Sequence, residues 1–83
     1  QNFFRVRFDR LTPTEQNFLR AMAELEHISK ATSDVATKLK LKIQQVGPTR
    51  SRLIKKGMIY SPSYGEIAFT VPLFGDFMKR VMP

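Results

Sequence analysis

Cysteine is absent from this 83-residue sequence, and histidine occurs once, as His27. Without cysteine the chain can form neither a disulfide framework nor a thiolate metal site, which is typical of a protein from a reducing compartment. Zinc sites in proteins use about three or four side-chain ligands, and His27 has no second histidine to share a metal with. We therefore expect no metal site and interpret His27 as an ordinary surface histidine.

Long apolar runs and phosphate-binding loops are also missing. The longest nearly apolar stretch, residues 67–74, contains Thr70 and Pro72 and is far shorter than the about 20 residues that span a bilayer. No glycine-rich segment has P-loop spacing, and Glu66 and Asp76 form no evident acid–base pair. We therefore expect a cytoplasmic protein with no membrane contact, no cofactor in this chain and no enzymatic activity of its own.

Acidic side chains do not occur in residues 35–65, although the whole chain has seven. The basic side chains of this segment are Lys38, Lys40, Lys42, Arg50, Arg52, Lys55 and Lys56. The remaining residues carry seven basic and seven acidic side chains, so this one segment accounts for the net charge of +7. A concentration of one sign favours a polyanionic partner, and chance clustering on a solvated face is the alternative.

The first half of the chain predicts two helices after an extended start. Residues 1–10 alternate like a strand, and an extended lead-in from an absent upstream domain is the alternative. Thr12, Pro13 and Glu15 have the spacing of a capping box with proline at the first helical position. Residues 27–30 are predicted as a linker or a very short strand. Residues 32–34 then offer N-caps for a second helix, which ends at a turn over residues 40–42.

The second half predicts a third helix, a hairpin and a last helix. The third helix begins around residues 43–47, so Pro48 has to lie in its first turn, and Gly57 ends it. Residues 58–61 and 66–71 flank a Pro/Gly turn and predict a hairpin. Pro72 is expected to open the last helix, with an apolar stripe of Leu73, Phe74, Phe77, Met78 and Val81. The fold class is therefore mainly α with a small β-hairpin, a winged helix-turn-helix in residues 11–83.

The third helix is the candidate site for double-stranded DNA. Val46, Leu53 and Ile54 share one face and are expected in the core, which leaves a polar and basic outer face. Arginine can pair with guanine and glutamine with adenine in the major groove, while lysine and serine commonly hold phosphates. The candidate DNA-binding residues are Gln44, Gln45, Thr49, Ser51, Arg52, Lys55, Lys56, Lys38, Lys40, Lys42 and Tyr64.

Two positions stay open at this point. Arg50 falls on the core side of the helix, where it acts either as an internal clamp that needs a partner or as a base contact. The hairpin tip has no cation, so Tyr64 and Ser63 either donate to phosphates or lie too far away. For Arg52 we expect that substitution by alanine weakens DNA binding without lowering the melting temperature.

The chain resembles the C-terminal winged-helix domain of bacterial AAA-type P-loop ATPases of the origin-recognition-like group. The resemblance is carried by LTPTE (residues 11–15), RAMAEL (20–25), VGPTR (46–50), LIKKGMIYSP (53–62) and AFTVPLF (68–74). It implies a DNA-binding or regulatory appendage, with an upstream ATPase domain of the same polypeptide as a further partner and residues 1–10 as the junction. One departure is Lys40, where the similar turn usually holds glycine.

The rival interpretation is a protein-interaction module that regulates the ATPase or self-associates. Winged helices also serve in protein docking, so fold alone does not decide function. An uncharged hairpin tip and exposed Phe and Met side chains on the last helix would favour this alternative, although packing against the first predicted helix is the simpler explanation of that apolar stripe.

Overall fold

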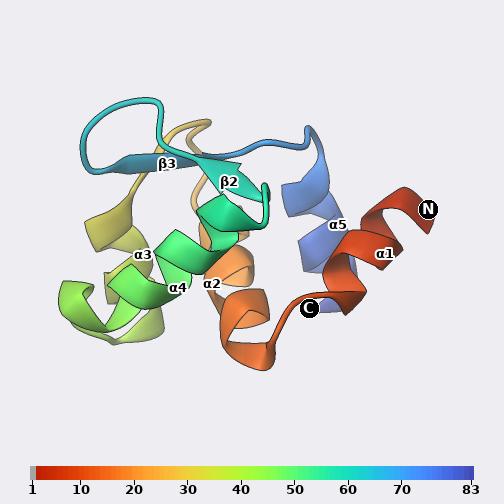
Figure 1. The fold of residues 1–83 in the computed structure, drawn as a ribbon, viewed down its shortest axis with the longest axis horizontal. Helices are drawn as coiled ribbons and strands as arrows, with labels where there is room; N and C mark the ends of the chain where they lie inside the picture. Colours follow the sequence, from red (N-terminus) through yellow and green to blue (C-terminus); the bar gives the residue numbers. More distant parts are fainter. Residues whose placement is uncertain (1) are drawn as a thin grey trace.

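The computed structural model describes residues 2–83, and in them the chain forms five helices and three short strands (Figure 1). In chain order these are α1 (Asn2–Asp9), α2 (Pro13–Glu24), β1 (Lys30–Ala31), α3 (Thr32–Leu39), α4 (Ile43–Lys55), β2 (Ile59–Tyr60), β3 (Glu66–Phe69) and α5 (Phe74–Val81). The predicted class, mainly α with a small β component, is confirmed. No helix in this described part is long and apolar enough to cross a bilayer.

The strands form one antiparallel sheet in the order β1-β3-β2. β2 and β3 are the predicted hairpin, with Ile59 opposite Phe69 and Tyr60 opposite Ala68. β1 adds a third strand on the other edge of β3, where Lys30 pairs with Ile67. The sheet lies along one side of the helices in Figure 1. Of the two alternatives for residues 27–30, the short strand is therefore correct at its end.

The core surrounds α2, which packs against α3, α4 and α5. Its Phe18, Leu19 and Met22 are at most 1% exposed, as its apolar spacing requires. Phe74 and Met78 of α5 are completely buried in the same cluster. Phe74, Phe77 and Met78 of the predicted stripe are thus core packing, whereas Leu73 is exposed.

The expectation of a strand or extended segment in residues 1–10 is wrong for the part that the structure describes, since Asn2–Asp9 is helical; Gln1 lies outside it. Phe4 and Phe8 stand four residues apart and so share one helix face. Their ring centroids lie 5.4 and 5.9 Å from that of Phe77 on α5. The alternation of apolar and basic residues is strand-like, but the helix places both Phe4 and Phe8 against Phe77 of α5.

Helix ends follow the sequence only in part. The α2 capping box is confirmed, because the Glu15 amide donates to Thr12 Oγ1 at 3.2 Å and the Thr12 amide donates to Glu15 Oε1 at 3.0 Å. The α3 cap is wrong: Ala31 precedes the helix without a side-chain cap, and Thr32 is its first residue and buried.

Three expectations about α4 and α5 are also wrong. Pro48 lies in the second turn of α4, inside the helix, and the carbonyl that its missing N–H would serve belongs to the exposed Gln44. Ile54 is 37% exposed rather than in the core. Pro72 does not open α5, since Leu73 adopts φ 68° before the helix starts and its side chain is 70% exposed.

Candidate nucleic-acid interface

A tight turn joins α3 to α4 and carries two of the candidate lysines. The Lys40 amide donates to the Thr37 carbonyl at 3.0 Å, and the Leu41 amide donates to the Ala36 carbonyl at 2.9 Å. This is the Schellman arrangement, which places a left-handed residue after the helix. Lys40 occupies that position with φ 59°, so the turn that usually holds glycine forms around a lysine. Lys40 and Lys42 are both exposed.

Lys42 also begins α4, where Gln45 supplies a cap. The Lys42 amide donates to Gln45 Oε1 at 2.7 Å, so this candidate base-reading oxygen already has a partner and only the Gln45 amide nitrogen is left to donate. Gln44, Ser51 and Lys55 of the same helix are exposed. The outer side of α4 therefore presents neutral and basic polar groups next to the two turn lysines.

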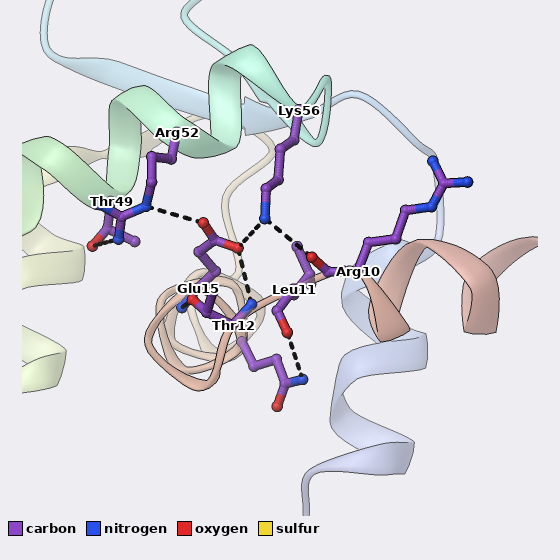
Figure 2. Close-up of polar contacts among 8 residues, drawn as sticks. Arg10, Leu11, Thr12, Glu15, Thr49, Arg52 and Lys56 are labelled. Atoms are coloured by element: carbon purple, nitrogen blue, oxygen red, sulfur yellow. Dashed lines mark hydrogen bonds and ion pairs between the residues drawn. The ribbon is translucent and has the colours of Figure 1, made fainter.

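Thr49 and Arg52 are not free for such contacts. Thr49 is 4% exposed, and its hydroxyl accepts a hydrogen bond from Arg52 at 3.2 Å. Arg52 Nε also donates to Glu15 Oε2 of α2 at 3.1 Å. As an exposed DNA contact, Thr49 is therefore excluded by its burial, and Arg52 is half-exposed but engaged (Figure 2).

Lys56 binds the other oxygen of the same carboxylate. Its Nζ lies 2.6 Å from Glu15 Oε1 and donates to the Arg10 carbonyl at 3.0 Å. Figure 2 shows Glu15 pointing from α2 toward α4, between Arg52 and Lys56. The two cations tie the end of α4 to the start of α2, and this carboxylate offsets part of the positive charge that the segment carries in sequence.

Glu15 is buried, yet its environment favours the charged form. Burial alone would raise the pKa of its carboxyl group, but hydrogen bonds from Lys56, the Thr12 amide and Arg52 together hold that pKa below the ordinary value of 4.5. The sequence identified Glu15 only as a capping residue. The missed signal is that an acidic side chain at the start of one helix was the available partner for cations at the end of another.

The other candidate cations differ in their surroundings. Lys38 Nζ lies 4.0 Å from Glu24 of α2, with both side chains near half-exposed, so this contact is weak. Arg50 is partly buried, and within the described residues it has neither an ion pair nor a side-chain hydrogen bond. The interpretation of Arg50 as an internal clamp therefore lacks the partner that it requires. Lys40, Lys42 and Lys55 are exposed and have no carboxylate partner in that same part of the chain.

The hairpin tip projects an unshielded tyrosine. Tyr64 is fully exposed, and the tight turn around it uses Gly65 at φ 78°. Ser63, the other candidate phosphate donor at this tip, already donates its hydroxyl to Glu66 at 3.1 Å. Hydrogen bonds from Ser29 and Ser63 hold the pKa of the Glu66 carboxyl below its ordinary value. Tyr64 is thus the free donor of the tip, beside an anchored carboxylate.

The fold and this face define a small, mainly helical domain with a polar and basic helix exposed beside a three-stranded sheet. The chain belongs to the family described as a domain of unknown function, DUF8462, which it matches over residues 1–78. No curated protein and no solved structure matches it significantly. Among the described residues, no cluster of three or more potential ligands could hold a metal ion.

Proposed function

We propose that this domain is a winged helix-turn-helix module that binds double-stranded DNA, with α4 in the major groove. The supporting arrangement is the order α2, β1, α3, α4 and the β2–β3 hairpin, in which a three-residue turn joins two short helices before the hairpin. Recognition helices of this type insert their N-terminal part into the groove. In this chain that part follows Lys40 and Lys42 directly.

The observation that carries the proposal is the basic face, defined here as Lys40, Lys42, Gln44, Ser51 and Lys55. Each of these side chains is exposed, and residues 35–65 contain no Asp or Glu. Exposed lysines without carboxylate partners attract phosphates and release counterions on binding, while Gln44 can read an adenine edge. Arg52 and Lys56 are reassigned from DNA contacts to the support of α4 through Glu15.

The resemblance to ATPase appendages adds an upstream ATPase domain to the proposal as a second partner. α1 is where such a domain would meet this one, because Phe3 and Val6 of this helix are 56% and 52% exposed. The same two residues are the observation that favours the rival function, a protein-interaction or self-association module. Light scattering of the chain with and without duplex separates the two, since self-association through α1 raises the mass without DNA.

The test of DNA binding is a nuclear magnetic resonance titration of the chain with a random-sequence duplex at low salt. We expect amide shifts concentrated in residues 40–55, because α4 and the turn before it face the groove. The amides of α5 serve as the internal control and should barely move. Shifts confined to α1 or α5, or no shift at low salt, would reject DNA binding through α4.

A further inference from the structure

A cavity of about 210 Å³ lies at the C-terminal end of α4, away from Lys40 and Lys42 of the basic face. It is lined by Arg7 of α1, Arg10 and Leu11 of the following turn, and Lys56 and Met58 after α4. A water molecule takes up about 30 Å³ of the liquid, so this space admits a tetrahedral oxyanion with several ligand atoms attached. α4 has 13 residues, which corresponds to about 20 Å of helix between the cavity and the N-terminal end of α4.

The polar lining of the cavity is cationic. Arg7, Arg10 and Lys56 contribute it, and no carboxylate lines the cavity among the described residues. Glu15 offsets the charge of Lys56 from behind, whereas Arg7 and Arg10 form no ion pair in that part of the chain. In Figure 2 the Arg10 side chain extends away from the Glu15 carboxylate. The cavity therefore keeps an excess of positive charge that nothing described in the fold neutralises.

The Arg7 guanidinium is stacked on a ring, and its buried Nε lacks an acceptor. Its guanidinium carbon lies 4.5 Å from the centre of the Phe3 ring, one turn earlier on α1, and such stacking fixes the plane of the group. Among residues 2–83 its buried Nε has no hydrogen-bond partner, an arrangement that costs free energy. A planar guanidinium that lines a cavity can present its terminal nitrogens to a pair of phosphate oxygens.

The remaining lining explains why a small anion would bind more strongly here than on the open surface. Leu11 and Met58 are 6% and 3% exposed, so they form an apolar wall beside the cations. Charge interactions next to such a wall are screened less than those in bulk water. Lys56 is fixed by the Arg10 carbonyl and Glu15, and its ammonium group has one donor left over from these two bonds.

We propose that this cavity binds the phosphate group of a small ligand, either free phosphate or a phosphate monoester, through Arg7 and Arg10. None of the basic-face residues lines the cavity, although Lys55 directly precedes Lys56. A ligand here bridges α1 to the end of α4 and so links the position of α1 to the helix that carries the basic face.

The experiment is a titration of the 83-residue chain with inorganic phosphate at constant ionic strength, followed by amide shifts. We expect saturable shifts at residues 7–11 and 56–58. Arg10→Gln, whose side chain is exposed, should weaken binding at least about 10-fold, the loss expected for one charged hydrogen bond. Arg7→Lys, which keeps the charge and removes the planar fork, should weaken it as well. Absence of saturable shifts at these amides overturns the proposal.

Matched controls separate this site from the DNA proposal and from a general charge effect. Arg80→Gln on α5 and Lys42→Gln on the basic face each remove one charge outside the cavity and should leave the phosphate titration unchanged. Equal weakening of phosphate binding by all four variants would reject a specific site in the cavity.

A second titration uses adenosine monophosphate in place of phosphate: tighter binding than phosphate at the same amides identifies a monoester ligand. A third arm uses a short duplex. Shifts at residues 7–11 with the duplex and none with either small anion would overturn the small-ligand proposal.

Discussion

Glu15 has two tasks at the residue scale. Its Oε1 accepts a hydrogen bond from the Thr12 amide before α2, and its two oxygens hold Arg52 of α4 and Lys56 directly after α4. A buried carboxylate is stabilising only when such partners satisfy it, because otherwise the loss of hydration dominates. The position of α4, and with it the basic face, therefore depends on a residue of another helix.

Replacing this carboxylate should destabilise the fold. We expect Glu15→Gln to lower the free energy of unfolding by about 1–3 kcal/mol, because the amide keeps the Thr12 bond and loses the attraction of two cations. Urea denaturation measures the change. Glu24→Gln is the control, since Glu24 pairs with Arg20 at the surface and should cost less. An equal loss in both variants would contradict a supporting role for Glu15.

The same carboxylate predicts how stability depends on pH. The pKa of Glu15 is lowered in the folded chain, so its stabilising effect is present above the unfolded pKa of about 4.5. As the pH falls through the folded pKa, protonation removes that effect and the free energy of unfolding decreases. Urea midpoints between neutral and strongly acidic pH should decline less for Glu15→Gln than for the parent chain. Identical declines would exclude Glu15 as a source of the pH dependence of stability.

Lys40 combines backbone strain with a charge for DNA. Its left-handed φ of 59° costs a non-glycine residue about 1 kcal/mol. Lys40→Gly should therefore raise the melting temperature while weakening DNA binding, so stability and affinity change in opposite directions. Thermal unfolding and a duplex titration on the same preparation measure both. Lys42→Gln is the comparison, which should weaken binding without raising the melting temperature. A Lys40→Gly variant with a lower melting temperature than the parent chain would contradict the proposed backbone strain at Lys40.

At the element scale, the sequence predicted those helices whose ends have local signals. The α2 capping box and Gly57 after α4, at φ 77°, are both where spacing placed them. α1 was missed because its helical form depends on Phe77, a residue about 70 positions away, and local alternation cannot reveal such packing. Pro48 was misplaced because the carbonyl it leaves unpaired belongs to the exposed Gln44, and no local signal in the sequence marks the positive φ of the exposed Leu73.

The packing of α1 on α5 is itself open to test. Phe8 is half-buried with its ring 5.9 Å from Phe77, so Phe8→Ala should lower the free energy of unfolding by about 1–3 kcal/mol, below the cost for a fully buried phenylalanine. Val6→Ala, at a position that is 52% exposed, should change it by less than about 0.5 kcal/mol. Chemical denaturation of both variants gives the comparison. Similar values would mean that α1 does not pack as described.

Only part of the candidate site could be predicted, because local sequence does not show how one helix packs against another. Exposure of Gln44, Ser51 and Lys55 follows from helix periodicity and was recovered. Burial of Thr49 and the pairing of Arg52 and Lys56 depend on the side chains that α2 presents to α4. The periodicity of a single helix gives no information about such a neighbour. The expectation for Arg52→Ala changes accordingly: this substitution should lower stability as well as DNA binding.

At the scale of the whole molecule, the charge is divided between two ends of α4. Lys40, Lys42 and Gln44 of the basic face lie at its start, Ser51 and Lys55 lie farther along it, and the cavity with Arg7 and Arg10 lies at its end. Between them Glu15 neutralises part of the cationic segment and fixes α4 against α2. The net charge of +7 therefore produces two separate anion-attracting regions rather than one uniform field, and binding to either should be distinguishable by local substitutions.

The most direct test of the central claim is the salt dependence of duplex affinity, measured by fluorescence anisotropy for three chains. These are the parent chain, Lys40→Gln/Lys42→Gln/Lys55→Gln, and a charge-matched control, Arg5→Gln/Lys79→Gln/Arg80→Gln. Each phosphate contact contributes about 0.9 to the slope of log affinity against log salt. We predict that the basic-face variant loses about 2–3 units of slope and that the control stays near the parent value. Equal slopes for the two triple variants, or no binding by the parent chain at low salt, would contradict DNA recognition by this face.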